Sequence, residues 1–239
     1  SAVADEAGAA PLDSLEDERA RLKATRKSLR NDVEEVLEAT ISAVLVEADI
    51  SSWGEIVFPP VDIRLGEPPK VLVTSPRDRI SRKDDVLLDP GVSVLQSEAL
   101  EGSLRDDWDL SALVTGIGGL ATYPSSIIDT APLRGTLRIA AHEWIHQYLV
   151  FHPLGRRIYS SPEMRTLNET FSDIVERDIG DRAFALLGGT PGPPLPRGTE
   201  APEVSAEEDD RKDANEFDFA EEMRKTRQRV DELLAEGAV

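Results

Sequence analysis

Two histidines and a glutamate are the residues of this chain whose types and spacing could do chemistry. His142, Glu143 and His146 form the pattern His-Glu-x-x-His within an otherwise apolar run. In an α-helix, residues four apart lie on one face, so both imidazoles can bind the same metal ion. Glu143 lies about 100° round that helix from His142, where its carboxylate can take a proton from metal-bound water and pass it to a leaving amine. The pattern therefore predicts a catalytic metal site with Glu143 as general base.

Such a site needs a further ligand. A catalytic zinc usually has three protein ligands and one water. Residues 167–173 offer candidates, because they carry Asn168, Glu169 and Asp173 on a predicted helix downstream. The remaining histidine, His152, comes after the metal helix and is followed by a proline, so we expect it to be a loop or cap residue rather than a ligand.

The metal motif, followed by Asn-Glu-x-x-x-Asp at residues 168–173, resembles the gluzincins, the thermolysin-like branch of the zincin metallopeptidases. The resemblance covers residues from about 110 to 180. It implies that His142, His146 and Glu169 bind zinc and that Glu143 is the general base. Between His146 and Glu169 lie 22 residues, slightly more than is usual for the family, which a longer connecting loop would accommodate.

The resemblance also implies residues that support the site. Asn168 and Asp173 would hydrogen-bond the ligand histidines and hold their tautomers. Thermolysin-like enzymes place a tyrosine in the loop between the metal helix and the third-ligand helix, where it stabilises the oxyanion. Tyr159 is the only tyrosine in that loop, and its phenol donates without ionising at neutral pH. The alternative is that Tyr159 only packs.

A strand before the metal helix is the candidate substrate-binding element; it comprises Leu120, Ala121, Thr122 and Tyr123. In gluzincins a strand in this place is a sheet edge whose backbone pairs with an extended peptide. An ordinary core hairpin is the alternative, since Gly-Gly and proline serve any hairpin. The family's aminopeptidases carry a glutamate in a Gly-x-Met-Glu-Asn-type segment here. Residues 116–130 contain no glutamate, which favours an endopeptidase, or an exopeptidase that recognises its substrate differently.

Two helices must position these side chains. The metal helix is predicted over residues 132–151, with Asp129 and Thr130 as N-cap candidates and a proline in the first turn. Ser161 and the proline after it predict the start of the helix that carries Glu169, and Gly180 is its C-cap candidate.

The remaining elements predict the fold class. Short β-branched segments separated by Gly and Pro indicate strands, and a helix is expected between them. The strands are expected at residues 61–65, 70–74, 85–88, 109–117 and 120–124, and the helix at residues 94–108. We expect an α+β, zincin-like metallopeptidase domain: a mainly antiparallel sheet of about five strands over the active-site helices, with helical arms at both ends.

The expected domain organisation follows composition. Residues 1–13 are predicted to be disordered, 14–50 to form a long helical arm, 51–187 the catalytic domain, 188–214 a Pro/Gly/acid-rich linker and 215–239 a docking helix. Four apolar residues of the arm recur every seven positions: Leu15, Leu22, Leu29 and Val36. This spacing fits either an amphipathic surface helix or a coiled coil that mediates oligomerisation.

Charge and composition exclude several partners. The 239 residues include 46 acidic and 27 basic side chains, a net charge of −19, which argues against nucleic acid as a partner. The chain has no cysteine and hence no disulfide, and no apolar run approaches the roughly 20 residues that cross a bilayer. Because it starts at Ser1 and stops within a helical pattern, we expect a soluble fragment of a longer protein, whose other parts could include a signal or a membrane anchor.

The predicted function is zinc-dependent hydrolysis of peptide bonds in a peptide or protein substrate, with an endopeptidase favoured. One alternative is a catalytically silent binding or scaffold module built on a zincin fold, although an intact Glu143 argues against it. Another is a helical interaction protein whose zinc is structural.

Overall fold

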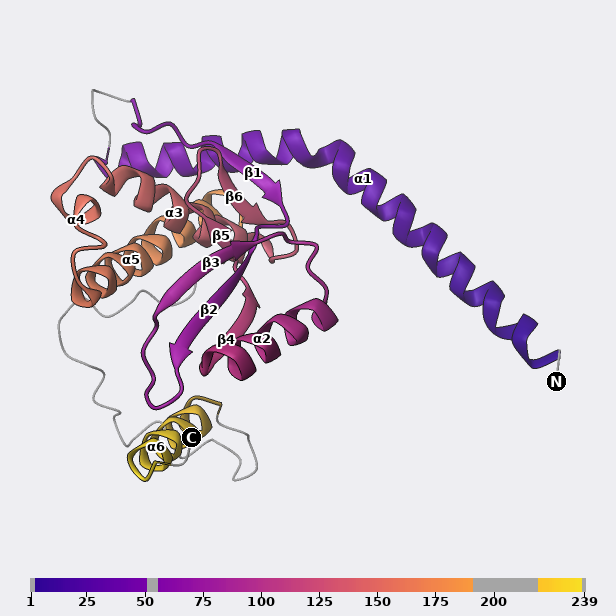
Figure 1. Ribbon diagram of the computed structural model, residues 1–239. Coiled ribbons are helices and arrows are strands. Elements are labelled where there is room, and N and C mark those ends of the chain that lie inside the picture. Colours follow the sequence, from indigo (N-terminus) through magenta and orange to yellow (C-terminus); the bar gives the residue numbers. More distant parts are fainter. Residues whose placement is uncertain (1–2, 51–55, 191–218, 238–239) are drawn as a thin grey trace, which may run out of the picture. The chain divides into compact units, whose positions relative to one another are not determined.

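The computed structural model describes residues 3–50, 56–190 and 219–237, with the backbone alone for residues 3–13 and 219–220. The chain divides into two compact units (Figure 1). The first comprises the segments up to Pro68 and from Gly118 to Gly192; the second comprises residues 69–117 and the C-terminal segment with helix α6 (Phe219–Ala235). The expected catalytic domain, residues 51–187, is thus divided between two units. Most of the expected linker lies outside the described residues.

Helix α1 (Val3–Glu47) begins earlier than the expected start near residue 14. The evenly spaced leucines Leu15, Leu22 and Leu29 are exposed, whereas Leu37 and Ile41 are buried. The second half of α1 therefore belongs to the core of the first unit, and the first half presents its apolar stripe outward. None of the described helices has the length and apolar content needed to cross a membrane.

The sheet of the first unit has three strands in the order β1-β6-β5. Strand β1 (Ile63–Gly66) pairs in parallel with β6 (Ser125–Ile128), and β5 (Gly119–Leu120) pairs antiparallel with β6. The expected strand over residues 120–124 is wrong beyond Leu120. The chain instead turns after β5 and returns as β6, whose alternating buried and half-buried residues suit the centre of a sheet.

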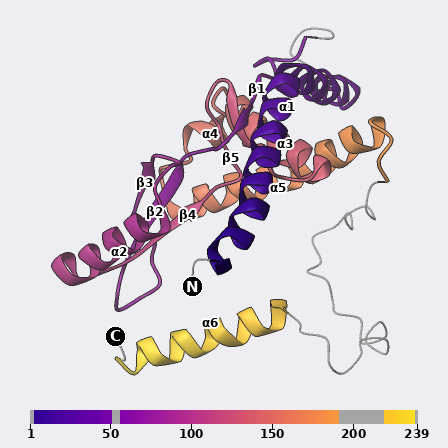
Figure 2. The same ribbon diagram turned by 90° about the vertical axis from the view of Figure 1, so that its right-hand side faces the viewer.

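Helix α1 closes one edge of this sheet. The side chains of Glu34 and Glu38 accept hydrogen bonds from the backbone N–H groups of Leu65 and Ile63, at 2.7 and 2.8 Å. Figure 2 shows α1 running alongside β1. These N–H groups, which would otherwise be free to pair with a further strand, thus donate to carboxylates.

The core of the first unit lies between this sheet and helices α1, α3 (Leu133–Leu149) and α5 (Pro162–Leu186). Its central side chain is Trp144, which is 2% exposed and donates a 2.8 Å hydrogen bond to the carbonyl of Pro59. The largest other fully buried apolar residues are Leu37, Ile41, Leu45, Ile127, Leu137, Ile145 and Ile179. Helix α3 is therefore held in place on its apolar side by dense packing.

Two predicted helix ends are corrected. The N-cap of α3 is Pro132, which makes no side-chain cap, while Asp129 pairs with Arg26 of α1 at 3.2 Å. Gly180 lies inside α5 rather than at its end. The position needs a glycine because a Cβ there would meet the backbone of Arg138 at 2.7 Å. This glycine lets α3 and α5 approach closely. The predicted N-cap of α5 is confirmed, since Ser161 accepts a hydrogen bond from the N–H of Met164.

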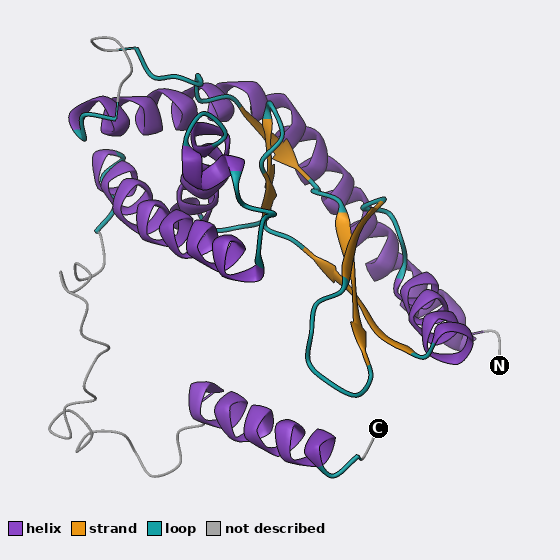
Figure 3. Cartoon of the chain, turned by 60° about the vertical axis from the view of Figure 1, so that its left-hand side comes forward, coloured by secondary structure: helices purple, strands orange, loops and turns teal. Residues whose placement is uncertain are grey.

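The second unit contains a second three-stranded sheet. Strands β2 (Lys70–Pro76), β3 (Asp84–Leu88) and β4 (Leu110–Gly116) are antiparallel in the order β3-β2-β4. Helix α2 (Val94–Trp108) has the predicted bounds and starts with a capping box between Ser93 and Gln96. The described strands thus form two small sheets, drawn in orange in Figure 3, and not the single sheet of about five strands that we expected.

Candidate metal centre

Helix α3 brings two imidazoles together. His142 and His146, one turn apart, have their Nε2 atoms 3.0 Å from each other and their ring centroids 4.7 Å apart. Both side chains are mostly buried, with exposed fractions of 17% and 15%. The pair is therefore held at the surface of the core, facing α5.

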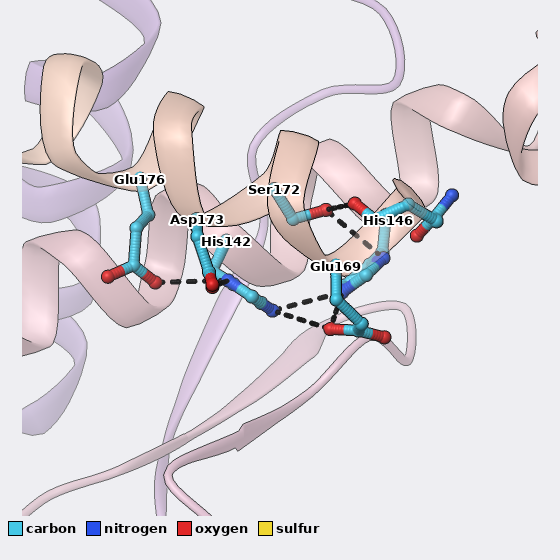
Figure 4. Close-up of polar contacts among 7 residues, drawn as sticks. His142, His146, Glu169, Ser172, Asp173 and Glu176 are labelled. Atoms are coloured by element: carbon cyan, nitrogen blue, oxygen red, sulfur yellow. Dashed lines mark hydrogen bonds and ion pairs between the residues drawn. The ribbon is translucent and has the colours of Figure 1, made fainter. Parts of the chain in front are cut away.

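Helix α5 adds the carboxylate that the sequence singled out. The Oε2 atom of Glu169 lies 3.5 Å from the Nε2 atoms of both His142 and His146 (Figure 4). Ligand atoms about 2.1 Å from a tetrahedral zinc are separated by about 3.4 Å. The three atoms are therefore spaced as ligands of one zinc ion would be.

The other ring nitrogens also have partners. Glu176 Oε2 lies 3.0 Å from Nδ1 of His142, and Ser172 Oγ lies 3.5 Å from Nδ1 of His146. The Ser172 hydroxyl donates to the carbonyl of Asn168 at 2.9 Å, which leaves its oxygen free to accept. When both Nδ1 atoms donate, both Nε2 atoms carry lone pairs, which repel each other at 3.0 Å unless a proton or cation lies between them. This donor set fits zinc.

The two residues expected to hold the histidines behave differently. Asp173 Oδ1 is 3.5 Å from Nδ1 of His142, so it lies beside this ring as a second carboxylate. Asn168 does not hydrogen-bond a histidine: its side chain is 1% exposed, and both amide atoms lack a partner among the described residues. Ser172 takes the place beside His146.

Sequence reasoning missed Ser172 and Glu176. They lie three and seven residues after Glu169, positions that share its face of an α-helix. That spacing was available in the sequence. It was overlooked because the family pattern points to an aspartate at the fourth position.

Glu143 lies beside the histidines in a dry environment. Its side chain is buried, and burial raises the pKa of its carboxyl to about 7, although His142 and His146 oppose the shift. Strand β5 passes directly against it: a Cβ on Gly119 would lie 2.5 Å from Oε1 of Glu143. Only a glycine leaves room for the carboxylate here.

Charge couples the candidate ligands. Burial lowers the pKa of His142, but hydrogen bonds to Glu169 and Glu176 outweigh it and raise the value to about 10. The bonds to His142 and His146 hold the pKa of Glu169 well below its usual range. Because a metal ion competes with protons for the same nitrogens, zinc binding at neutral pH would release a proton from His142.

The predicted substrate strand is only partly a strand. Leu120 belongs to β5, whereas Ala121, Thr122 and Tyr123 follow it in a turn that is anchored by Gln147. The Gln147 amide donates to the carbonyl of Thr122 and, at 2.7 Å, to the hydroxyl of Ser125. The segment next to the metal helix is therefore fixed to that helix.

The register of β5 against β6 sets the direction of its backbone groups. The N–H of Ile128 donates to the carbonyl of Gly118 at 2.8 Å, so these two residues face each other as a hydrogen-bonded pair. Bonded and non-bonded pairs alternate in an antiparallel ladder. Gly119, opposite Ile127, therefore directs its N–H and C=O away from β6.

Tyr159 belongs to the predicted site, whereas His152 was expected to be a loop or cap residue. Tyr159 is 83% exposed, and the guanidinium carbon of Arg165 lies 5.7 Å from its ring centroid. Its role as an oxyanion donor stays a prediction. His152 is the N-cap residue of the short helix α4 (Pro153–Arg156), and its ring stacks on Tyr148 at 4.4 Å. The prediction that His152 is a cap is confirmed.

Comparison of the chain with known protein families, curated proteins and solved structures gives no match. The resemblance to gluzincins therefore rests on the motif residues of the sequence alone.

Proposed function

We propose that this chain is a zinc-dependent peptidase, with endopeptidase activity favoured. The observation that carries the proposal is the convergence of His142, His146 and Glu169, whose ligand atoms lie 3.0–3.5 Å apart. A buried glutamate, Glu143, follows the first of these ligands. A structural site needs no buried base beside it, whereas hydrolysis does.

Glu143 is the proton carrier in this proposal. Bound zinc would polarise the scissile carbonyl and make water more acidic. The Glu143 carboxylate takes the proton of the attacking water and delivers it to the leaving amine nitrogen. In the zinc-free protein, burial raises the pKa of this carboxyl to about 7, near the ambient pH at which a general base works best.

Strand β5 is the proposed binding site of the peptide substrate. The outward N–H and C=O of Gly119 can pair with an extended peptide, as a strand added to a sheet edge. Glu143 lies directly against the same glycine. A peptide on this edge would thus bring its backbone close to the base and the candidate ligands.

The test separates zinc binding from hydrolysis. Glu143→Gln should keep one zinc per chain but lower the rate of casein cleavage by about a thousandfold, because only proton transfer is removed. His146→Ala and Glu169→Ala should lose the zinc itself, as measured by elemental analysis. Glu98→Gln, an exposed glutamate of α2, is the matched control and should leave both properties unchanged.

Mass spectrometry of the casein fragments tells an endopeptidase from an exopeptidase. A parent chain that binds zinc without cleaving casein or peptides would contradict the peptidase. It would support a silent zincin-like binding module or a structural zinc instead.

A further inference from the structure

We propose that Glu176 is the positioning residue that orients His142 for metal binding, in the place where the family pattern puts Asp173. The inference rests on the proposed zinc site. One face of α5 carries the candidate ligand Glu169 and, at the third, fourth and seventh positions after it, Ser172, Asp173 and Glu176. All of them point toward the imidazoles of α3 (Figure 4).

The packing of α3 against α5 places Glu176 opposite His142. Each step of four residues up α3 meets a step of four residues down α5. The pairs are Arg138 with Gly180, His142 with Glu176, and His146 with Ser172. Asp173 falls between two of these layers, so its carboxylate approaches the His142 ring less directly.

Distance and burial both favour Glu176. Its carboxylate lies 3.0 Å from Nδ1 of His142, against 3.5 Å for Asp173. The side chain of Glu176 is 23% exposed, whereas that of Asp173 is 53% exposed. Because water competes less with a buried hydrogen bond, Glu176 is the stronger partner.

The two histidines are thereby supported unequally. Nδ1 of His142 lies beside a carboxylate, and Nδ1 of His146 lies beside the neutral hydroxyl of Ser172. A carboxylate partner fixes the tautomer and increases the basicity of the metal-binding nitrogen more than a hydroxyl does. Loss of Glu176 should therefore weaken metal binding more than loss of Ser172.

Zinc affinity of the full chain tests this order by competition with a chromophoric chelator. Glu176→Gln should raise the zinc Kd about 10- to 100-fold, the range found for such supporting residues. Ser172→Ala should have a smaller effect, and Asp173→Asn should change the Kd less than about threefold. Circular dichroism at the assay temperature verifies that each variant is folded.

A resonance of His142 distinguishes orientation from general structural support. In the zinc-loaded parent, the Nδ1 proton of His142 should give a far-downfield NMR signal, because it is shared with a carboxylate. Glu176→Gln should move this signal upfield, and Asp173→Asn should leave it in place.

The inference would be overturned by a larger loss of affinity in Asp173→Asn than in Glu176→Gln. It would also be overturned by a second zinc bound by His142 Nδ1, Asp173 and Glu176. The second cluster has the spacing of a metal site, so the stoichiometry decides its role. The peptidase can fail alone, if zinc binds as described without hydrolysis. The Glu176 role can fail alone, if hydrolysis occurs and Glu176→Gln keeps full affinity. A parent chain that binds no zinc overturns both.

Discussion

The two edges of the sheet β1-β6-β5 are treated in opposite ways. At the β1 edge, the backbone N–H groups of Ile63 and Leu65 are bound by two glutamates of α1. At the β5 edge, Gly119 directs its backbone groups outward beside Glu143. A sheet edge is a template for pairing with another chain, so one edge of this sheet is closed to partners and the other can accept one.

The difference suggests separate roles for the two edges: the β1 edge stabilises the first unit, and the β5 edge belongs to the candidate site. The closed edge ties α1 to the sheet through contacts between residues distant in sequence. The β5 edge has only two strand residues. Because Gly119 has no side chain, its backbone can lie close to the candidate base, Glu143. Three predictions test the contrast.

The largest effect is expected at the β5 edge. Gly119→Val would place a Cβ 2.5 Å from Oε1 of Glu143 and 2.8 Å from Cγ2 of Ile139, so the carboxylate must move. Because misplacement of a catalytic group by about 1 Å can cost a hundredfold, casein cleavage should fall by about that factor or more. Zinc content should stay near that of the parent.

The matched control is Gly116→Val at the end of β4. A Cβ at Gly116 meets no atom within 4 Å, and this variant should keep its activity. Full activity in Gly119→Val would show that the proximity of β5 to Glu143 has no role in hydrolysis.

The closed edge should affect stability rather than activity. Glu34→Ala combined with Glu38→Ala leaves two backbone N–H groups of β1 without their partners. At about 1–3 kcal/mol for each lost partner, the free energy of unfolding in urea should drop by about 3 kcal/mol. Glu35→Ala, an exposed neighbour on the same helix, should have little effect. An equal loss in both proteins would mean that removing a carboxylate from α1, and not the edge contact, is responsible.

The smallest effect is a pH dependence at Glu38. Burial raises the pKa of this carboxyl, the hydrogen bond from Ile63 lowers it, and nearby acids, Asp62 first, raise it again, so the net shift is upward from 4.5. A raised pKa means that the stabilising contribution is complete below pH 4.5 and is lost as pH rises through the folded-state pKa.

The substitution Glu38→Gln keeps a carbonyl oxygen for Ile63 but cannot ionise. The unfolding free energy of the parent, measured relative to this variant, should therefore decrease as pH increases from 4.5 toward neutrality. An increase over that range would show that the hydrogen bond from Ile63 outweighs burial.

Local patterns in the sequence were sufficient for several features of the helices. The spacing of His142 and His146, the Ser161 cap of α5 and the bounds of α2 were all readable, because each depends on residues within a turn or two of one another. The structure also brings Glu169 close to both histidines, as the two motifs in the sequence led us to expect.

Long-range pairing was not readable in the same way. The parallel contact of β1 with β6 joins segments that a periodicity analysis treats separately, so the division into two sheets was missed. Glu34 and Glu38 look like ordinary solvent-facing helix residues until β1 is placed beside them. Gly180 was predicted to be a helix end because the contact that requires a glycine there, with the backbone of Arg138, is made to another helix.

The concentration of the candidate site on α5 has a consequence for how zinc would leave. The third ligand and the partners of both histidines, Glu169, Ser172 and Glu176, are all carried by one rigid helix packed against α3 at Gly180. If α5 separates from α3, these three contacts are lost together, and only the two histidines of α3 remain, which hold zinc more weakly than three ligands. Metal release and loss of the α3–α5 packing should then be a single cooperative event, with slow zinc exchange in the folded protein and rapid loss on unfolding.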